Sequence, residues 1–183
     1  MFRYIYIIPT ISLIINLLSI SAPAQSTFTI GIEQDALPYF TGGYFGAVWA
    51  GKGHLRGRAL LARVHKPDFI TPDGFTNNHT TAYAFLADYF LKEDWKGWWI
   101  GAGLVYWDNS IQSDQKLSTA QYHNTLLNGS LGYNWKFYRH FYLSPWAGMS
   151  LRINNRNKVT VDNQSFTPPL FNPEVSLKLG WHF

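Results

Sequence analysis

The side chains that could carry out catalysis are few and lie far apart in the sequence. The chain has no cysteine, so a nucleophile would be a serine with a histidine as its base and an acid to orient that histidine. The candidates are Asp35, His65, His79, Asp108, Ser110 and His123. Spacing along the chain does not show whether they come within hydrogen-bond reach, so an enzymatic function depends on the fold.

No motif predicts a cofactor or a metal ion. The stretch GAVWAGKG from Gly46 to Gly53 matches a phosphate loop, but Gly53 stands where Ser or Thr would bind magnesium. The six histidines show no spacing typical of a metal site. We therefore expect no cofactor and no metal.

The composition narrows the class of protein. Charged residues make up 14% of the chain and aromatic residues 17%, whereas soluble domains carry about 25% charged residues. The net charge of +4 is too small to suggest a nucleic-acid partner. A surface with so few charges predicts that much of it does not face water.

The N-terminus has the three parts of a secretory signal peptide. Arg3 precedes an apolar run from Ile5 to Ile20, and Ala22 and Ala24 form a small-residue cleavage site. The apolar run is shorter than the roughly 20 residues of a membrane-spanning helix. The predicted organisation is a signal peptide over 1–24 and one domain over 25–183.

The rest of the chain divides into eight segments that alternate or are rich in aromatic residues. Several have the ~9 to 11 residues that a tilted membrane strand requires. The segments are 26–33, 43–51, 55–66, 80–91, 97–107, 121–135, 141–153 and 173–183. The connections alternate between short turns at 52–54, 92–96 and 136–140 and longer loops at 34–42, 67–79, 108–120 and 154–172.

The direction of the alternation separates two kinds of barrel. A soluble lipocalin-type barrel would turn charged residues outward and apolar residues inward. In the last strand one parity is apolar, comprising Val175, Leu177, Leu179, Trp181 and Phe183, and the other is polar or small. This pattern favours an apolar outer surface around a polar interior, hence an all-β, eight-stranded antiparallel transmembrane up-and-down barrel.

These features resemble the small eight-stranded outer-membrane proteins of Gram-negative bacteria. The resemblance covers the mature chain and rests on the signal peptide, the alternation of short turns and long loops, and the final strand ending in Phe183. It implies an outer-membrane location with both termini periplasmic, contact with outer-membrane lipids, and a C-terminal strand read by the barrel-assembly machinery. We expect a monomer.

Charged residues on the inward parity should satisfy one another inside so narrow a barrel. Arg56 or Arg58 is expected near Asp88 on the neighbouring strand, and Glu33 near Lys178 because barrel closure makes the first and last strands neighbours. Such a network could be a static filling of the interior or a movable gate.

Two classes of function follow. The leading hypothesis is a structural or surface-interaction barrel, whose mouth could hold a small hydrophobic or lipid ligand. The long loops that would form this mouth carry Phe69, Ile70, Phe75, Phe166, Leu170 and Phe171. The alternative, suggested by members of the same superfamily, is an enzyme that modifies lipid A or phospholipids, with His65, His79, His123 and Asp35 as rim candidates.

Overall fold

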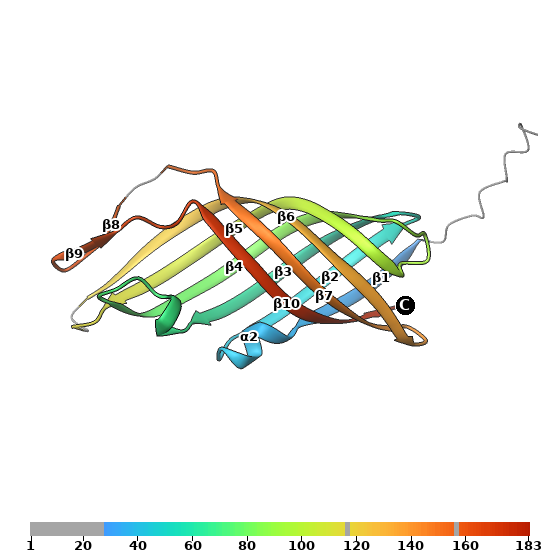
Figure 1. Ribbon diagram of the computed structural model, residues 1–183, viewed down its shortest axis with the longest axis horizontal. Helices are drawn as coiled ribbons and strands as arrows, with labels where there is room; N and C mark the ends of the chain where they lie inside the picture. The colour runs from blue at the N-terminus through green and yellow to red at the C-terminus, as the bar shows by residue number, and fades with distance from the viewer. Residues whose placement is uncertain (1–27, 116–117, 156–157) are drawn as a thin grey trace, which may run out of the picture.

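Eight antiparallel strands close into a barrel in the computed structural model, which describes residues 28–115, 118–155 and 158–183 (Figure 1). The barrel strands are β1 (Thr29–Asp35), β2 (Tyr44–Lys52), β3 (Leu55–Lys66), β4 (Phe75–Phe90), β5 (Gly97–Ser113), β6 (Thr119–Tyr138), β7 (Phe141–Arg152) and β10 (Phe171–His182). Each pairs with its neighbour in the sequence of barrel strands, and β10 closes the ring on β1. The predicted eight-stranded up-and-down barrel is confirmed. The predicted signal peptide lies outside the described residues.

The remaining elements occupy the long connections. They are the helix α2 (Ala36–Phe40), the 3₁₀ turn η1 (Asp68–Ile70), and a hairpin of β8 (Val159–Val161) and β9 (Gln164–Phe166). No helix in the described ranges is long and apolar enough to cross a bilayer.

The barrel wall is much taller on one side than on the other. β1 has 7 residues, whereas β5 has 17 and β6 has 20. Two predicted loops are therefore shorter than expected, because β4 begins at Phe75 and the β5–β6 ladder continues to the Gln112 and Thr119 pair. Backbone pairing carries these strands beyond the apolar part of the wall, where the sequence no longer alternates.

Side chains follow the predicted facing. Val48, Phe85, Ile100, Leu131 and Val175 point outward with exposed fractions of 60%, 77%, 59%, 52% and 70%. Alternate positions on the same strands are buried inside. The outer surface of the wall is thus an apolar belt, and the lipocalin-type facing is excluded.

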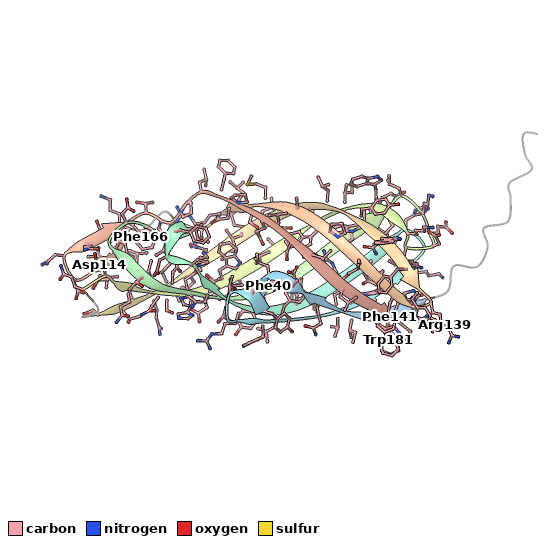
Figure 2. All side chains as sticks on the ribbon, turned by 60° about the horizontal axis from the view of Figure 1, so that its bottom comes forward. Phe40, Asp114, Arg139, Phe141, Phe166 and Trp181 are labelled. Atoms are coloured by element: carbon pink, nitrogen blue, oxygen red, sulfur yellow. The ribbon has the colours of Figure 1, made fainter. Side chains whose placement is uncertain are left out.

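The two ends of the barrel carry different connections. The short turns and the C-terminus lie at one end, and the β8–β9 hairpin lies at the other (Figure 1). Figure 2 shows Phe141, Trp181 and Arg139 at the short-turn end and Phe166 at the opposite end. We call the hairpin end the mouth.

Helix α2 lies on the outside of the wall, part-way along the barrel (Figure 1). It begins after Asp35, whose side chain caps the helix by accepting a hydrogen bond from the Leu37 amide at 3.2 Å. The helix contacts β2, β3 and β10, next to the mouth-side ends of β1 and β2, the two shortest barrel strands. Phe40 at its end is 87% exposed.

Candidate functional site: the barrel interior and its mouth

Four buried charged side chains meet inside the barrel near the short-turn end. Arg56 donates to Glu33 at 2.7 Å and to Asp88 at 2.8 Å. Arg58 donates to both oxygens of Asp88, at 2.6 and 2.9 Å, and to Glu33 at 3.2 Å. All four residues are at most 2% exposed. We call them the interior charge cluster, in which two guanidinium groups balance two carboxylates.

Aromatic rings surround this cluster. The Arg56 guanidinium carbon lies 4.9 Å from the Phe90 ring centroid and 5.3 Å from that of Trp49, within cation–π range. The Tyr142 hydroxyl donates to Glu33 at 2.7 Å. The buried rings that pack together here are Trp49, Phe90, Trp95, Trp99 and Tyr142. Charges and rings together fill the interior at this level.

Barrel register explains which sequence-predicted pairs come together. Arg56 faces Asp88 across the β3–β4 ladder, as predicted. Glu33 faces Gly180 and Lys178 faces Asp35, so Glu33 and Lys178 are diagonal neighbours on the inner face, near each other as predicted but without a direct ion pair. Glu33 instead reaches across the interior to the two arginines of β3.

Lys178 also packs against aromatic rings, which the sequence did not predict. Its ammonium lies 4.1 Å from the Trp146 ring centroid and 5.2 Å from that of Trp99. Among the described residues, no carboxylate lies within ion-pair distance of it. The aromatic faces add a cation–π attraction to the longer-range attraction of Glu33 and Asp88.

A second polar network lies further toward the mouth. Asp35 accepts hydrogen bonds from the Trp146 indole at 2.8 Å and from the Ser176 hydroxyl. Nearby, Ser150 donates to Glu174 at 2.6 Å and accepts from the Asn128 amide at 2.9 Å. Trp146, Ser150 and Glu174 were not predicted as members of this network, although their inward parity on β7 and β10 was a usable signal.

An apolar layer fills the other side of the interior at this height. It contains Phe45, Ala47, Ala62, Ala82, Ala84, Val105, Trp107 and Leu126. These residues come from β2 to β6 and are at most 8% exposed. The predicted polar interior is therefore wrong at this height, where the inward positions of β2 to β6 are apolar.

The β8–β9 hairpin packs over the mouth. Phe166 contacts Phe75 and Tyr122 with ring centroids 5.0 and 5.6 Å away. Val161 belongs to the same buried cluster, and the Asp162 carboxylate accepts a hydrogen bond from the Ser113 hydroxyl at 2.6 Å. The hairpin thus forms a cap held by apolar and polar contacts.

The loop residues proposed as a contact surface divide into two groups. Phe75 and Phe166 pack beneath the cap. Phe69, Ile70 and Phe171 are 87%, 57% and 58% exposed, and Leu170 is half-buried. An apolar surface at the mouth therefore comes mainly from η1.

The rim candidates do not assemble a catalytic triad. His65 and His79 stack with ring centroids 4.4 Å apart, and His123 pairs with Asp108 at 3.7 Å. Asp35 lies elsewhere, buried in its own network.

The candidate nucleophile is also unpaired with a base. Ser110 faces His79 across the β4–β5 ladder, but no hydrogen bond joins the two side chains in the described structure. Within the same residues, no three His, Asp or Glu side chains gather as a metal site.

The residues of the predicted insertion signal share the outer face of β10. Val175, Leu177, Leu179, Trp181 and Phe183 are 40% to 70% exposed. Trp181 stacks between Phe141 and Phe183, with centroid distances of 5.1 and 5.4 Å. The Phe183 amide donates to the Ile30 carbonyl at 2.9 Å, which joins the C-terminus to β1.

Comparisons with solved structures identify the same architecture. The N-terminal β-barrel domain of Pseudomonas aeruginosa OprF superposes with a TM-score of 0.60 and 16% identity, over 87% of this chain and 100% of that chain. A major outer membrane protein from Thermus thermophilus superposes with a TM-score of 0.52 and 13% identity, over 86% of this chain and 100% of that chain. Neither a protein-family model nor a curated protein sequence matches. The chain therefore shares the fold of outer-membrane β-barrels.

Proposed function

We propose that this chain is a closed structural barrel of a bacterial outer membrane, with both termini in the periplasm and the mouth at the cell surface. The single observation that carries the proposal is the pairing of an apolar outer belt with a filled interior. Exposed residues such as Phe85 and Val175 would be costly in water and suit lipid. Inside, the interior charge cluster and its surrounding rings occupy the lumen.

A filled lumen argues against a general porin. Eight strands enclose space just wide enough for side chains, and here the charge cluster, the apolar layer and the cap lie in succession along the lumen. We expect the inserted protein to show no stepwise ion conductance in a planar lipid bilayer. Heat-modifiable migration of the protein recovered from the bilayer lipid is the control for insertion, and discrete channels from such protein would contradict the proposal.

The orientation has its own test. Lys158 is exposed beside the cap, so trypsin added to intact cells should cut the barrel in the connection between β7 and β10. Cleavage only after the outer membrane is permeabilised would place the mouth on the periplasmic side and reverse the proposed orientation.

The proposed role is structural: the barrel contacts lipids within the membrane and other molecules at the cell surface, and it does not modify lipids chemically. It is supported by the exposed Phe69 and Ile70 and by the separation of Asp35 from the rim histidines. Mass spectra of lipid A and phospholipids from cells with and without the protein should therefore agree. If lipid A or a phospholipid gained or lost an acyl group, and this change disappeared when His79 was substituted, the protein would be a lipid-modifying enzyme and this proposal would be wrong.

A further inference from the structure

Three basic side chains form a patch on the outer surface just above the apolar belt. Arg63 and His65 lie on β3 and His79 lies on β4, at outward-facing positions. The two imidazole rings stack at 4.4 Å, and Arg63 faces Thr81, the outward residue next to His79. We call Arg63, His65 and His79 the outer basic patch.

The outer basic patch has no acidic partner in the protein. Among the described residues, no carboxylate lies within ion-pair distance of Arg63, His65 or His79. The nearest acidic residue on the outer face is Asp108 of β5, which faces Thr81 of β4. Its carboxylate pairs with His123 at 3.7 Å. The patch therefore presents the unpaired positive charge of Arg63 beside two imidazole rings, an arrangement that favours an anion.

The surface directly toward the short-turn end is apolar. Leu61 precedes Arg63 on the same face of β3, and Tyr83 and Phe85 follow His79 on the same face of β4. Their exposed fractions are 39%, 51% and 77%. A molecule that contacts both regions would need an anionic head and a hydrocarbon tail.

We propose that the outer basic patch binds the phosphate group of a membrane lipid whose acyl chains lie along the apolar belt. This inference rests on the proposed function, since the patch must lie at the headgroup level of a membrane. Arg63 supplies a planar guanidinium that can bind two phosphate oxygens, and the imidazole N–H groups of His65 and His79 supply further donors. A free phosphate ion would gain the polar contacts without the apolar ones.

Binding can be measured with protein folded in a neutral detergent. Dihexanoyl phosphatidic acid is the probe, dihexanoylglycerol tests the acyl chains alone, and inorganic phosphate tests the ion alone. Proton NMR of the histidine rings reports contact at His65 and His79. We expect saturable shifts with phosphatidic acid and much smaller shifts with the two controls. Equal shifts with inorganic phosphate, or none with phosphatidic acid, would overturn the inference.

Variants locate the site. Arg63→Gln should weaken phosphatidic acid binding about tenfold, because a charge-assisted pair of hydrogen bonds is lost. Lys158→Gln removes the same charge from the exposed loop beside the cap and should leave binding unchanged. Equal weakening by both variants would show a general charge effect and contradict the site.

The two proposals fail in different ways. If the protein is heat-modifiable and inserts into vesicles but does not bind phosphatidic acid, the lipid site is contradicted and the membrane-barrel proposal stands. If the protein binds phosphatidic acid in detergent but does not insert into vesicles, the membrane-barrel proposal is contradicted instead.

Discussion

The four residues of the interior charge cluster show how a narrow barrel can bury charge. Removing an ion from water is costly, and the cost is recovered only where geometry and hydrogen bonds are good. Asp88 accepts from both arginines and Glu33 accepts from both arginines and Tyr142. Because each carboxylate serves two cations, loss of one carboxylate should affect the whole cluster.

Asp88→Leu should therefore destabilise the barrel by about 3 to 5 kcal/mol, because two buried arginines would share the single carboxylate of Glu33. Equilibrium unfolding by urea in lipid vesicles measures the change. Asp73→Leu is the matched control, because Asp73 is exposed in the loop between β3 and β4 and its carboxylate has no hydrogen-bond or ion-pair partner among the described residues. A loss below about 1 kcal/mol would contradict the role assigned to Asp88.

A double variant tests whether charge balance is the cause. Arg58→Met/Asp88→Leu leaves Arg56 paired with Glu33, so its unfolding free energy should fall by less than the sum of the two single changes. Additive losses would instead indicate that packing, not charge balance, dominates at this level of the barrel.

The cap should depend on pH through Asp162. Hydrogen bonds from Ser113 and Ser118 lower the pKa of Asp162 below its ordinary value of 3.8. A lowered folded-state pKa means that the charged form stabilises the docked cap, fully above the ordinary pKa and less as pH falls through the lowered value. Hydrogen exchange at Val159 to Phe166, corrected for intrinsic rates from about pH 6 to about pH 2, should show the cap opening in acid.

Asp162→Asn is the control for this pH effect. The variant lacks the titrating group, so exchange in the cap should become independent of pH over the same interval. An unchanged pH profile in Asp162→Asn would mean that another group controls the cap.

Among the elements, the outer face of each strand was the easiest feature to predict. Residues such as Leu177 and Leu179 alternate with polar ones because one side meets a uniform apolar environment. The extensions of β5 and β6 and the β8–β9 hairpin carry no such alternation, because their surroundings are irregular. Their lengths depend on backbone pairing and on packing against Phe75 and Ile111.

The interior site was predictable only in part, for a geometric reason. Arg56 and Asp88 are adjacent across one ladder, so parity and height bring them together. Glu33 contacts arginines two strands away, and Lys178 lies against Trp146 and Trp99. Which side chains meet across the lumen depends on side-chain length and ring orientation, and alternation along a strand contains neither.

Strand β6 offers a matched pair of glycines that tests the packing of the interior. A Cβ at Gly132 would lie 2.5 Å from Trp99 and 2.9 Å from the Pro145 carbonyl, whereas a Cβ at Gly129 meets nothing within 4 Å. The Trp99 ring cannot shift freely, because its indole donates to Ser144 at 3.1 Å. Gly132→Ala should lower the free energy of unfolding, measured with urea in lipid vesicles, by about 1 to 3 kcal/mol.

Gly129→Ala is the control for this prediction and should be close to neutral. If both variants unfold at the same urea concentration, the interior is looser around Trp99 than the contacts imply.

At the scale of the whole molecule, three kinds of contact close the lumen in succession. Ion pairs and rings lie near the short turns, an apolar layer opposite a polar network lies in the middle, and the hairpin covers the mouth. Each layer draws on several strands, so the interior links strands that do not pair directly. This arrangement favours a rigid barrel whose variable parts are its outer loops.

The C-terminal residue should matter for assembly more than for stability. Phe183→Ser removes an exposed ring but leaves the backbone bond to Ile30. We expect slower insertion in membranes that contain the barrel-assembly machinery and nearly normal spontaneous folding in detergent. Pulse-chase measurement of the heat-modifiable form compares the two, and Phe171→Ser, at the other end of β10, is the control. Equal rates for both variants in cells would contradict a special role for Phe183.

The junction between β1 and β10 has a mechanical consequence. β10 pairs with β7 from Phe171 to Trp181, but it pairs with β1 only from Lys178 to His182. This seam is five residue pairs long, as is the ladder that joins β1 to β2, and it bears the load directly when the two ends of the chain are pulled apart. Glu33 attaches β1 to the wall in a second way, because its carboxylate forms ion pairs with Arg56 and Arg58 of β3. Under force the seam should open first, while β1 stays tethered to the wall from within.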